Sequence, residues 1–128
     1  MLARTSLPLF LMLGTAASAA TLPLKPGTYV LTGTPCHDPA FAAMFDYDGH
    51  HFSYPHATKC NSVVKSHAGK TYRISETCSA LGDGMATKPD TTQATYTVLS
   101  SARVSVSRGA GTAASSYRWC AKTQTKRS

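Results

Sequence analysis

The stretch that decides the fold class is "SVVKSHAGKTYRISETC", residues 62–78. β-branched and aromatic residues flank a turn at Ala68 and Gly69, which is the pattern of a β-hairpin. If the hairpin turns symmetrically about Gly69, Cys60 lies opposite Cys78. Residues directly opposite each other on paired strands are close enough for a disulfide. The stretch therefore predicts two antiparallel strands and one candidate cysteine pair.

The cysteines indicate an oxidising compartment. All four, Cys36, Cys60, Cys78 and Cys120, follow residue 20, and an even number in an exported chain predicts two disulfides. Pairing Cys60 with Cys78 leaves Cys36 with Cys120, which ties the first predicted strand to the last. Pairing in chain order, Cys36–Cys60 and Cys78–Cys120, is nearly as compatible with the spacing, so the connectivity stays open.

Upstream of this hairpin the sequence predicts one strand and a second hairpin. Residues 27–34 ("GTYVLTGT") are rich in β-forming residues and follow a proline. Residues 44–54 ("MFDYDGHHFSY") predict a hairpin with a two-residue type I′ turn at Asp48 and Gly49. Between them, residues 38–45 ("DPAFAAMF") are the only candidate helix, with an aspartate cap and a length of about two turns.

Downstream, residues 91–108 predict two strands joined around residues 100–102, and residues 115–122 ("SSYRWCAK") predict the last strand. Residues 79–90 ("SALGDGMATKPD") carry two glycines and a proline and predict the longest loop. About seven to eight short strands in successive hairpins predict one all-β domain, a small up-and-down (calycin-like) barrel or a sandwich. A closed barrel is favoured because closure removes exposed strand edges.

Side chains that alternate inward along each strand are expected to supply the core of this barrel. Whether they fill the interior or leave it hollow enough for a ligand stays open. The expected core residues are Tyr29, Leu31, Phe45, Tyr47, Phe52, Tyr54, Tyr72, Ile74, Tyr117 and Trp119.

Residues 1–20 have the pattern of a cleaved signal peptide. A positive start precedes an apolar run at residues 7–13 that is too short to span a bilayer, and "TAASAA" supplies small residues for cleavage. Residues 21–121 are then the barrel domain and residues 122–128 a basic C-terminal tail. No later segment is apolar enough to cross a membrane, so the protein is expected to be periplasmic or secreted.

The charge of the chain says little about its partner. The formal net charge is +7, and loss of Arg4 with the leader leaves +6. The basic residues are dispersed, apart from residues 122–128, and dispersed lysine and arginine are typical of a solvated surface. Export counts against nucleic acid as a partner, and we expect a monomer.

A candidate metal site lies in the hairpin "DYDGHHFSYPH", residues 46–56. Histidine nitrogens with one or two aspartate oxygens are suitable ligands for zinc or copper(II). Neighbouring histidines on a strand point to opposite faces, however, so a hairpin with a polar, solvent-facing side is the competing interpretation. The candidate ligands are Asp46, Asp48, His50, His51 and His56.

Catalytic patterns are not found in the sequence. Six carboxylates include no pair predicted to face across a cleft, and there is no G-x-S-x-G elbow. The chain is therefore expected not to be an enzyme. Small exported barrels bind through loops or through the barrel mouth, and the loop predicted at residues 79–90 offers Asp83, Met85 and Lys88 as candidate partner-binding residues.

The stretch "SSYRWCAK" is similar, over a handful of residues, to tyrosine–cysteine strand motifs of small periplasmic lysozyme inhibitors. The resemblance implies a barrel that binds or blocks something in the cell envelope, and no residue role is carried over from it.

Two functions are therefore expected from the sequence. The first is an exported, non-catalytic binding or inhibitory module without a cofactor, acting on an envelope protein or a small ligand. The alternative is a periplasmic copper- or zinc-binding protein that uses the histidine-rich hairpin.

Overall fold

The computed structural model describes residues 21–109 and 111–121 and contains eight antiparallel strands in one sheet. Seven hydrogen-bonded strand pairs link them in the order β3-β2-β1-β8-β7-β6-β5-β4. The strands are β1 Gly27–Leu31, β2 Met44–Tyr47, β3 Phe52–Ser53, β4 Ala57–Ala68, β5 Thr71–Leu81, β6 Ala86–Ser100, β7 Arg103–Arg108 and β8 Ser115–Cys120.

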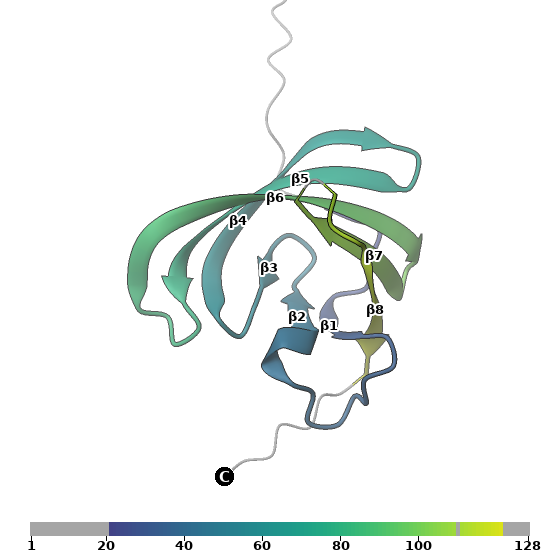
Figure 1. The fold of residues 1–128 in the computed structure, drawn as a ribbon, viewed down its shortest axis with the longest axis horizontal. Helices are drawn as coiled ribbons and strands as arrows, with labels where there is room; N and C mark the ends of the chain where they lie inside the picture. Colours follow the sequence, from purple (N-terminus) through teal and green to yellow (C-terminus); the bar gives the residue numbers. More distant parts are fainter. Residues whose placement is uncertain (1–20, 110, 122–128) are drawn as a thin grey trace, which may run out of the picture.

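The sheet curls into a nearly closed up-and-down barrel, as the succession of hairpins predicts (Figure 1). β3 and β4 are the two ends of the strand order, and an isolated bridge between Tyr54 and Ala57 brings them together. The turn between β5 and β6 packs against this junction, because a Cβ added to Gly82 would overlap the carbonyl oxygen of Pro55. Glycine at position 82 therefore allows the two turns to meet and complete the barrel wall.

The hairpin of β4 and β5 pairs its cysteines as the sequence predicts, but its turn is not symmetric about Gly69. Ala68 pairs with Thr71, so Gly69 and Lys70 form the turn, and a bulge between Val64 and Ser66 brings the strands into the predicted register. Cys60 lies opposite Cys78 and forms a disulfide with a Cα–Cα distance of 4.0 Å. The second disulfide joins Cys36 to Cys120, with a Cα–Cα distance of 5.8 Å. The alternative pairing in chain order is wrong, because the register of this hairpin already places Cys60 and Cys78 face to face.

The prediction of a long loop at residues 79–90 is wrong. β5 continues to Leu81 and β6 begins at Ala86, so only residues 82–85 form the turn. Cys78 pairs with Asp90 and Ala80 pairs with Ala86, which leaves three residues of β6 opposite one of β5. This irregularity contains Pro89, which has no N–H to give to a regular ladder. The glycines and the proline thus mark a tight turn and a bulge in a long hairpin.

Two other local predictions are also wrong. The candidate helix at residues 38–45 is a single 3₁₀ turn, Phe41–Ala43 (η1), whose N-cap Ala40 has no side chain able to accept a hydrogen bond. The type I′ turn is replaced by a four-residue loop between the paired residues Tyr47 and Phe52. The Asp48 carboxylate stabilises the four-residue loop, because it accepts the N–H groups of His50 and His51 at 2.8 and 2.6 Å.

One half of the barrel interior is packed with aromatic rings. Tyr47 stacks on Phe52 and Phe52 on Tyr96, with ring centroids 4.7 and 4.8 Å apart. The Tyr47 hydroxyl accepts a hydrogen bond from the Leu22 N–H at 2.9 Å, so the segment before β1 covers this half. Aromatic ring packing of this kind stabilises the fold by more than the burial of apolar surface alone. We call this region the packed half.

Most of the predicted core residues lie in or against the core. Tyr72, Tyr117 and Trp119 are partly buried and pack against the core cluster. Leu31 is an exception: it is the last residue of β1, is only half-buried and does not belong to the cluster. The predicted residues that are buried in the cluster are Tyr29, Phe45, Tyr47, Phe52, Tyr54 and Ile74.

No helix in the described ranges is long and apolar enough to cross a membrane.

Candidate binding cavity

The inward-facing side chains of β5, β6 and β7 differ in size and polarity between the two halves of the barrel. On β5 the inward positions run from Tyr72 and Ile74 to Glu76, then to residues 78 and 80, a cysteine and an alanine. Strands pleat with a period of two, so these residues share one face. Across the sheet, the row of Tyr72 continues into Tyr96 and Val106 of β6 and β7.

The next rows are different. Ile74 lies opposite Ala94, and Ala94 lies opposite Arg108 on β7. Glu76 in turn lies opposite Thr92. Tyr96 and Val106 thus give way to Ala94 and Arg108 in the next row of β6 and β7, and on β5 the change comes one row later, from Ile74 to Glu76.

A cavity of about 650 Å³ occupies this second half of the barrel, which we call the hollow half. Its volume lies within the range of about 300–1,000 Å³ that is typical of small-molecule sites. Its walls come from six strands, η1 and the turn between β3 and β4. The apolar wall residues are Phe41, Ala42, Met44, Phe45, Ala57, Ala80, Leu81 and Tyr117, and the charged ones are Glu76, Lys88, Asp90 and Arg108.

Glu76 is a buried carboxylate at the cavity floor, with only 3% of its surface exposed. The Ser62 hydroxyl donates to its Oε2 atom at 3.0 Å, and Ser62 itself is fully buried. Nη1 of Arg108 lies 3.9 Å from Oε1. A buried charge is costly unless it is paired and hydrogen-bonded, and Glu76 has both kinds of partner.

Arg108 is held in place by two tyrosines. Its Nη2 donates to the Tyr54 hydroxyl at 3.0 Å, and its guanidinium carbon lies 4.8 Å from the centre of the Tyr54 ring. The hydroxyls of Tyr54 and Tyr96 are 3.1 Å apart. The Arg108 side chain is nevertheless 40% exposed, so part of the guanidinium faces the cavity. Among the described residues Nη1 has no hydrogen-bond partner.

Burial controls the proton affinity of these tyrosines. It raises the pKa of Tyr96 to about 12, with a further contribution from the negative charge of Glu76. Burial also raises the pKa of Tyr54 far above its usual range. Both hydroxyls are therefore neutral throughout the physiological pH range and act as hydrogen-bonding groups.

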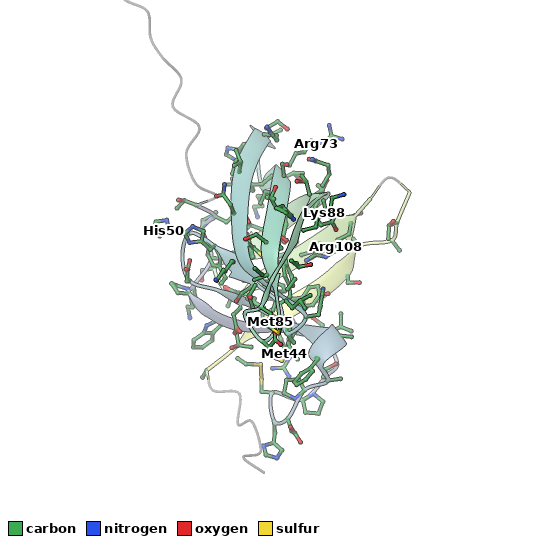
Figure 2. All side chains as sticks on the ribbon, turned by 90° about the vertical axis from the view of Figure 1, so that its left-hand side faces the viewer. Met44, His50, Arg73, Met85, Lys88 and Arg108 are labelled. Atoms are coloured by element: carbon green, nitrogen blue, oxygen red, sulfur yellow. A yellow bond between two sulfur atoms is a disulfide. The ribbon has the colours of Figure 1, made fainter. Side chains whose placement is uncertain are left out.

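The mouth of the cavity carries exposed apolar side chains. Phe41 from η1 is 71% exposed and Leu81 from the end of β5 is 46% exposed, and both line the cavity. Met85, in the turn between β5 and β6, is 65% exposed, and its carbonyl oxygen accepts the Leu81 N–H at 2.9 Å. Figure 2 shows Met85 at the same end of the molecule as Met44, a wall residue.

The three predicted partner-binding residues lie at or near this mouth. Lys88 lines the cavity from β6. Asp83 lies in the turn before Met85 and accepts its N–H at 2.9 Å. Lys88 thus lines the cavity, whereas Asp83 and Met85 lie in the neighbouring turn and are not among the residues that line it.

The candidate metal ligands are not brought together. His56 lines the cavity, whereas Asp46, Asp48 and His51 line a separate hollow of about 450 Å³. His50 lies on the opposite side of the molecule from Arg108 in Figure 2. Within the described ranges, no group of three or more His, Cys, Asp or Glu side chains is arranged to hold a metal ion.

Contacts among the five candidate ligands are confined to the loop between β2 and β3. Nδ1 of His51 lies 3.3 Å from Oδ2 of Asp48, and the His50 N–H donates to Oδ1 of Asp48. The N–H groups of His51 and His50 lower the pKa of the Asp48 carboxyl. These contacts stabilise the loop between β2 and β3. The Asp48 oxygens that could bind a metal ion are already hydrogen-bonded within that loop.

Glu76 and Arg108 are functional candidates that were not predicted from the sequence. A signal for Glu76 was present: it is the only glutamate of the chain and it stands at an inward position, two residues after Ile74. Arg108 likewise follows Val104 and Val106 at the same spacing. Their meeting depends on the register between β5, β6 and β7, which the sequence alone does not determine.

The fold and cavity together define a class of protein: a small, nearly closed antiparallel β-barrel with two disulfides and a cavity at one end. The chain matches no protein-family model, and searches of curated proteins and of solved structures found no match.

Proposed function

We propose that the mature chain is an exported, non-catalytic binding module whose cavity holds a small, largely apolar ligand. The observation that supports this most strongly is the cavity itself, with apolar walls and a few charged groups at its floor. Apolar walls supply affinity in such sites, and a small number of polar groups fix the orientation of the ligand. The two disulfides are consistent with an exported protein in an oxidising compartment.

The state of the floor residues favours binding over catalysis. Glu76 is engaged by Ser62 and Arg108, and the hydroxyls of Tyr54 and Tyr96 are engaged by each other and by Arg108. A general acid or base works best with a pKa near the operating pH, whereas burial raises the pKa of both tyrosines far above it. These groups therefore provide a fixed polar environment.

A small ligand suits this surface better than an envelope protein does. A specific protein interface buries roughly 800 Å² on each partner. Phe41 and Leu81 are exposed apolar residues that line the cavity, and Met85 is exposed in the neighbouring turn. Such residues can contact a ligand as it enters and help to exclude water once it is bound.

The proposal is tested with N-phenylnaphthylamine, a neutral apolar dye whose fluorescence increases in an apolar site. Titration of the oxidised mature chain should give saturable, one-to-one binding. The variant Thr92→Trp places a large ring in the cavity from an exposed wall position opposite Glu76. Because the ring occupies the space of the dye, we expect affinity to fall about tenfold or more.

The matched control is Thr91→Trp. Thr91 is the preceding residue on β6, is also exposed, and bonds the Thr77 hydroxyl on the outer face at 2.7 Å. This variant should bind the dye as the parent does. Absence of saturable binding, or equal affinity in the two variants, would show that the cavity is not a ligand site.

A further inference from the structure

We propose that the ligand is an acyl-chain carboxylate, bound with its carboxylate on Arg108 at the cavity floor and its chain running out past Phe41 and Leu81. This inference rests on the proposed function, because it specifies the ligand class of the same cavity.

The accessible charge at the cavity favours an anion. Only 3% of the Glu76 surface is exposed, and its carboxylate already has Ser62 and Arg108 as partners. Arg108 is 40% exposed, and its Nη1 has no hydrogen-bond partner among the described residues. Lys88 adds a second cation to the wall, against one further anion, Asp90.

The guanidinium is also oriented for a carboxylate. Tyr54 covers one part of it and accepts a hydrogen bond from Nη2, so Arg108 loses little further freedom when a ligand binds. Because Nη2 already donates to the hydroxyls of Tyr54 and Tyr96, at 3.0 and 3.5 Å, a ligand carboxylate would accept a charge-assisted hydrogen bond from Nη1.

The cavity is charged at its floor and apolar at its mouth, and this arrangement determines which end of a ligand enters first. Glu76 and Arg108 lie at the floor, in or next to the row of Ile74 and Ala94, whereas Phe41 and Leu81 line the mouth. A ligand with a charged head and an apolar tail is therefore complementary to the site when its head enters first. The tail then covers the exposed apolar residues of the mouth.

A peptide with a C-terminal carboxylate is a poorer match. The wall strands β5, β6 and β7 already use their backbone groups in ladders with their neighbours. A peptide inserted into the barrel would bury N–H and C=O groups without partners, which is costly. An alkyl chain brings no such groups.

The experiment compares three ligands that share one alkyl chain: decanoate, decanol and decyltrimethylammonium. Each is titrated calorimetrically into the oxidised mature chain, well below the concentration at which it forms micelles. We expect one-to-one binding in every case in which binding occurs, with decanoate about tenfold or more tighter than the other two.

The variant that tests Arg108 is the double substitution Arg108→Met with Glu76→Gln, which removes both charges and leaves no buried carboxylate unpaired. Decanoate affinity should fall about tenfold while decanol affinity stays within about twofold. Arg73→Met is the matched control, because Arg73 is exposed on the same sheet and does not line the proposed cavity.

The wild-type protein gives a readout that does not depend on the folding of this variant. In guanidinium-detected NMR, bound decanoate should shift the Nε–H resonance of Arg108 and leave that of Arg103, an exposed residue at the start of β7, unchanged. An unshifted Arg108 resonance with decanoate bound would overturn the inference.

The outcomes separate the two proposals. Equal binding of decanoate, decanol and decyltrimethylammonium keeps the cavity as a ligand site and overturns the carboxylate inference. The carboxylate inference is also overturned if the double variant loses no more affinity for decanoate than for decanol. If none of the three ligands binds and the naphthylamine dye does not bind either, both proposals fail.

Discussion

The packed half and the hollow half of the barrel are built from the same strands but contain different side chains. In the packed half, Tyr47, Phe52 and Tyr96 stack with ring centroids 4.7 and 4.8 Å apart. In the hollow half, Glu76 and Arg108 stand at inward positions around a cavity of about 650 Å³. Strand geometry is common to both, so the difference comes from side-chain size and charge.

Because of this difference, we expect substitutions at one end of a strand to affect stability and substitutions at its other end to affect the proposed ligand binding. Substitutions in the packed half remove contacts that hold the barrel together, because protein interiors are close-packed and tolerate voids poorly. Substitutions around the cavity change a space that is already open. The two halves should therefore respond differently to the same chemical change, and each of the following predictions tests that.

The largest effect is expected at alkaline pH, where ionisation of buried tyrosines should unfold the whole barrel. Burial raises the pKa of Tyr29 and of Tyr96 from 10.0 to about 12. The folded state thus holds these protons more tightly than the unfolded state does. The contribution of these two tyrosines to the free energy of unfolding is fully present below about pH 10. It is lost as the pH rises from there through about 12. Tyrosine absorbance and circular dichroism should therefore change together in one cooperative transition.

Gradual ionisation of the tyrosines with the circular dichroism unchanged would contradict this. It would mean that the buried tyrosine rings are accessible to solvent in the native state.

The second largest effect is expected from removing one ring of the packed half. Phe52→Ala should lower the free energy of unfolding by about 3–5 kcal/mol, because Phe52 is fully buried and stacks on two rings. Phe41→Ala is the counterpart at the cavity mouth and should change stability by less than about 0.5 kcal/mol, since Phe41 is 71% exposed. Urea denaturation measures both values.

Dye binding should show the reverse order. Phe41→Ala should weaken binding of the naphthylamine dye, because Phe41 lines the cavity. Equal destabilisation by the two substitutions would remove the distinction between the halves.

A smaller effect on stability is expected from the charged pair of the hollow half. Arg108→Met leaves Glu76 buried without its cation and should destabilise the protein by about 2 kcal/mol, reduced by the partial exposure of Arg108. Adding Glu76→Gln should recover part of this loss, because the uncompensated charge is removed. Urea denaturation of both single variants and of the double variant gives the coupling energy. Strict additivity would show that the two side chains do not interact.

The smallest effect is expected from removal of the candidate metal ligands. Calorimetric titration with Cu(II) and Zn(II) should give binding no tighter than micromolar, because the five side chains do not converge on one point. The triple variant His50→Ala, His51→Ala, His56→Ala should give a similar titration and fold normally. One-to-one sub-micromolar binding that is lost in this variant would instead support the metal-binding alternative.

Much of the architecture could be predicted from particular residues. A turn near Gly69 predicted the pairing of Cys60 with Cys78, which the structure reaches through a bulge between Val64 and Ser66. The aromatic residues around Asp48 did mark a buried hairpin. Residues 79–90 were predicted less well, because glycine and proline mark both loops and irregular strands. The long hairpin there is stabilised by pairing with residues far away in the sequence.

The leader predicted at residues 1–20 and the basic tail at residues 122–128 lie outside the described residues. The expectation that the protein is exported therefore rests on the sequence and on the two disulfides.

The all-β class of this protein follows from its residues alone, because period-two alternation and turn residues act locally, and the aromatic residues stand where the packed half needs them. The hollow end of the barrel does not follow from any one segment. The cavity exists because Ala94, Glu76 and Arg108 fall in adjacent rows of three strands. That coincidence depends on the register between strands, which long-range pairing and packing establish only in the folded chain.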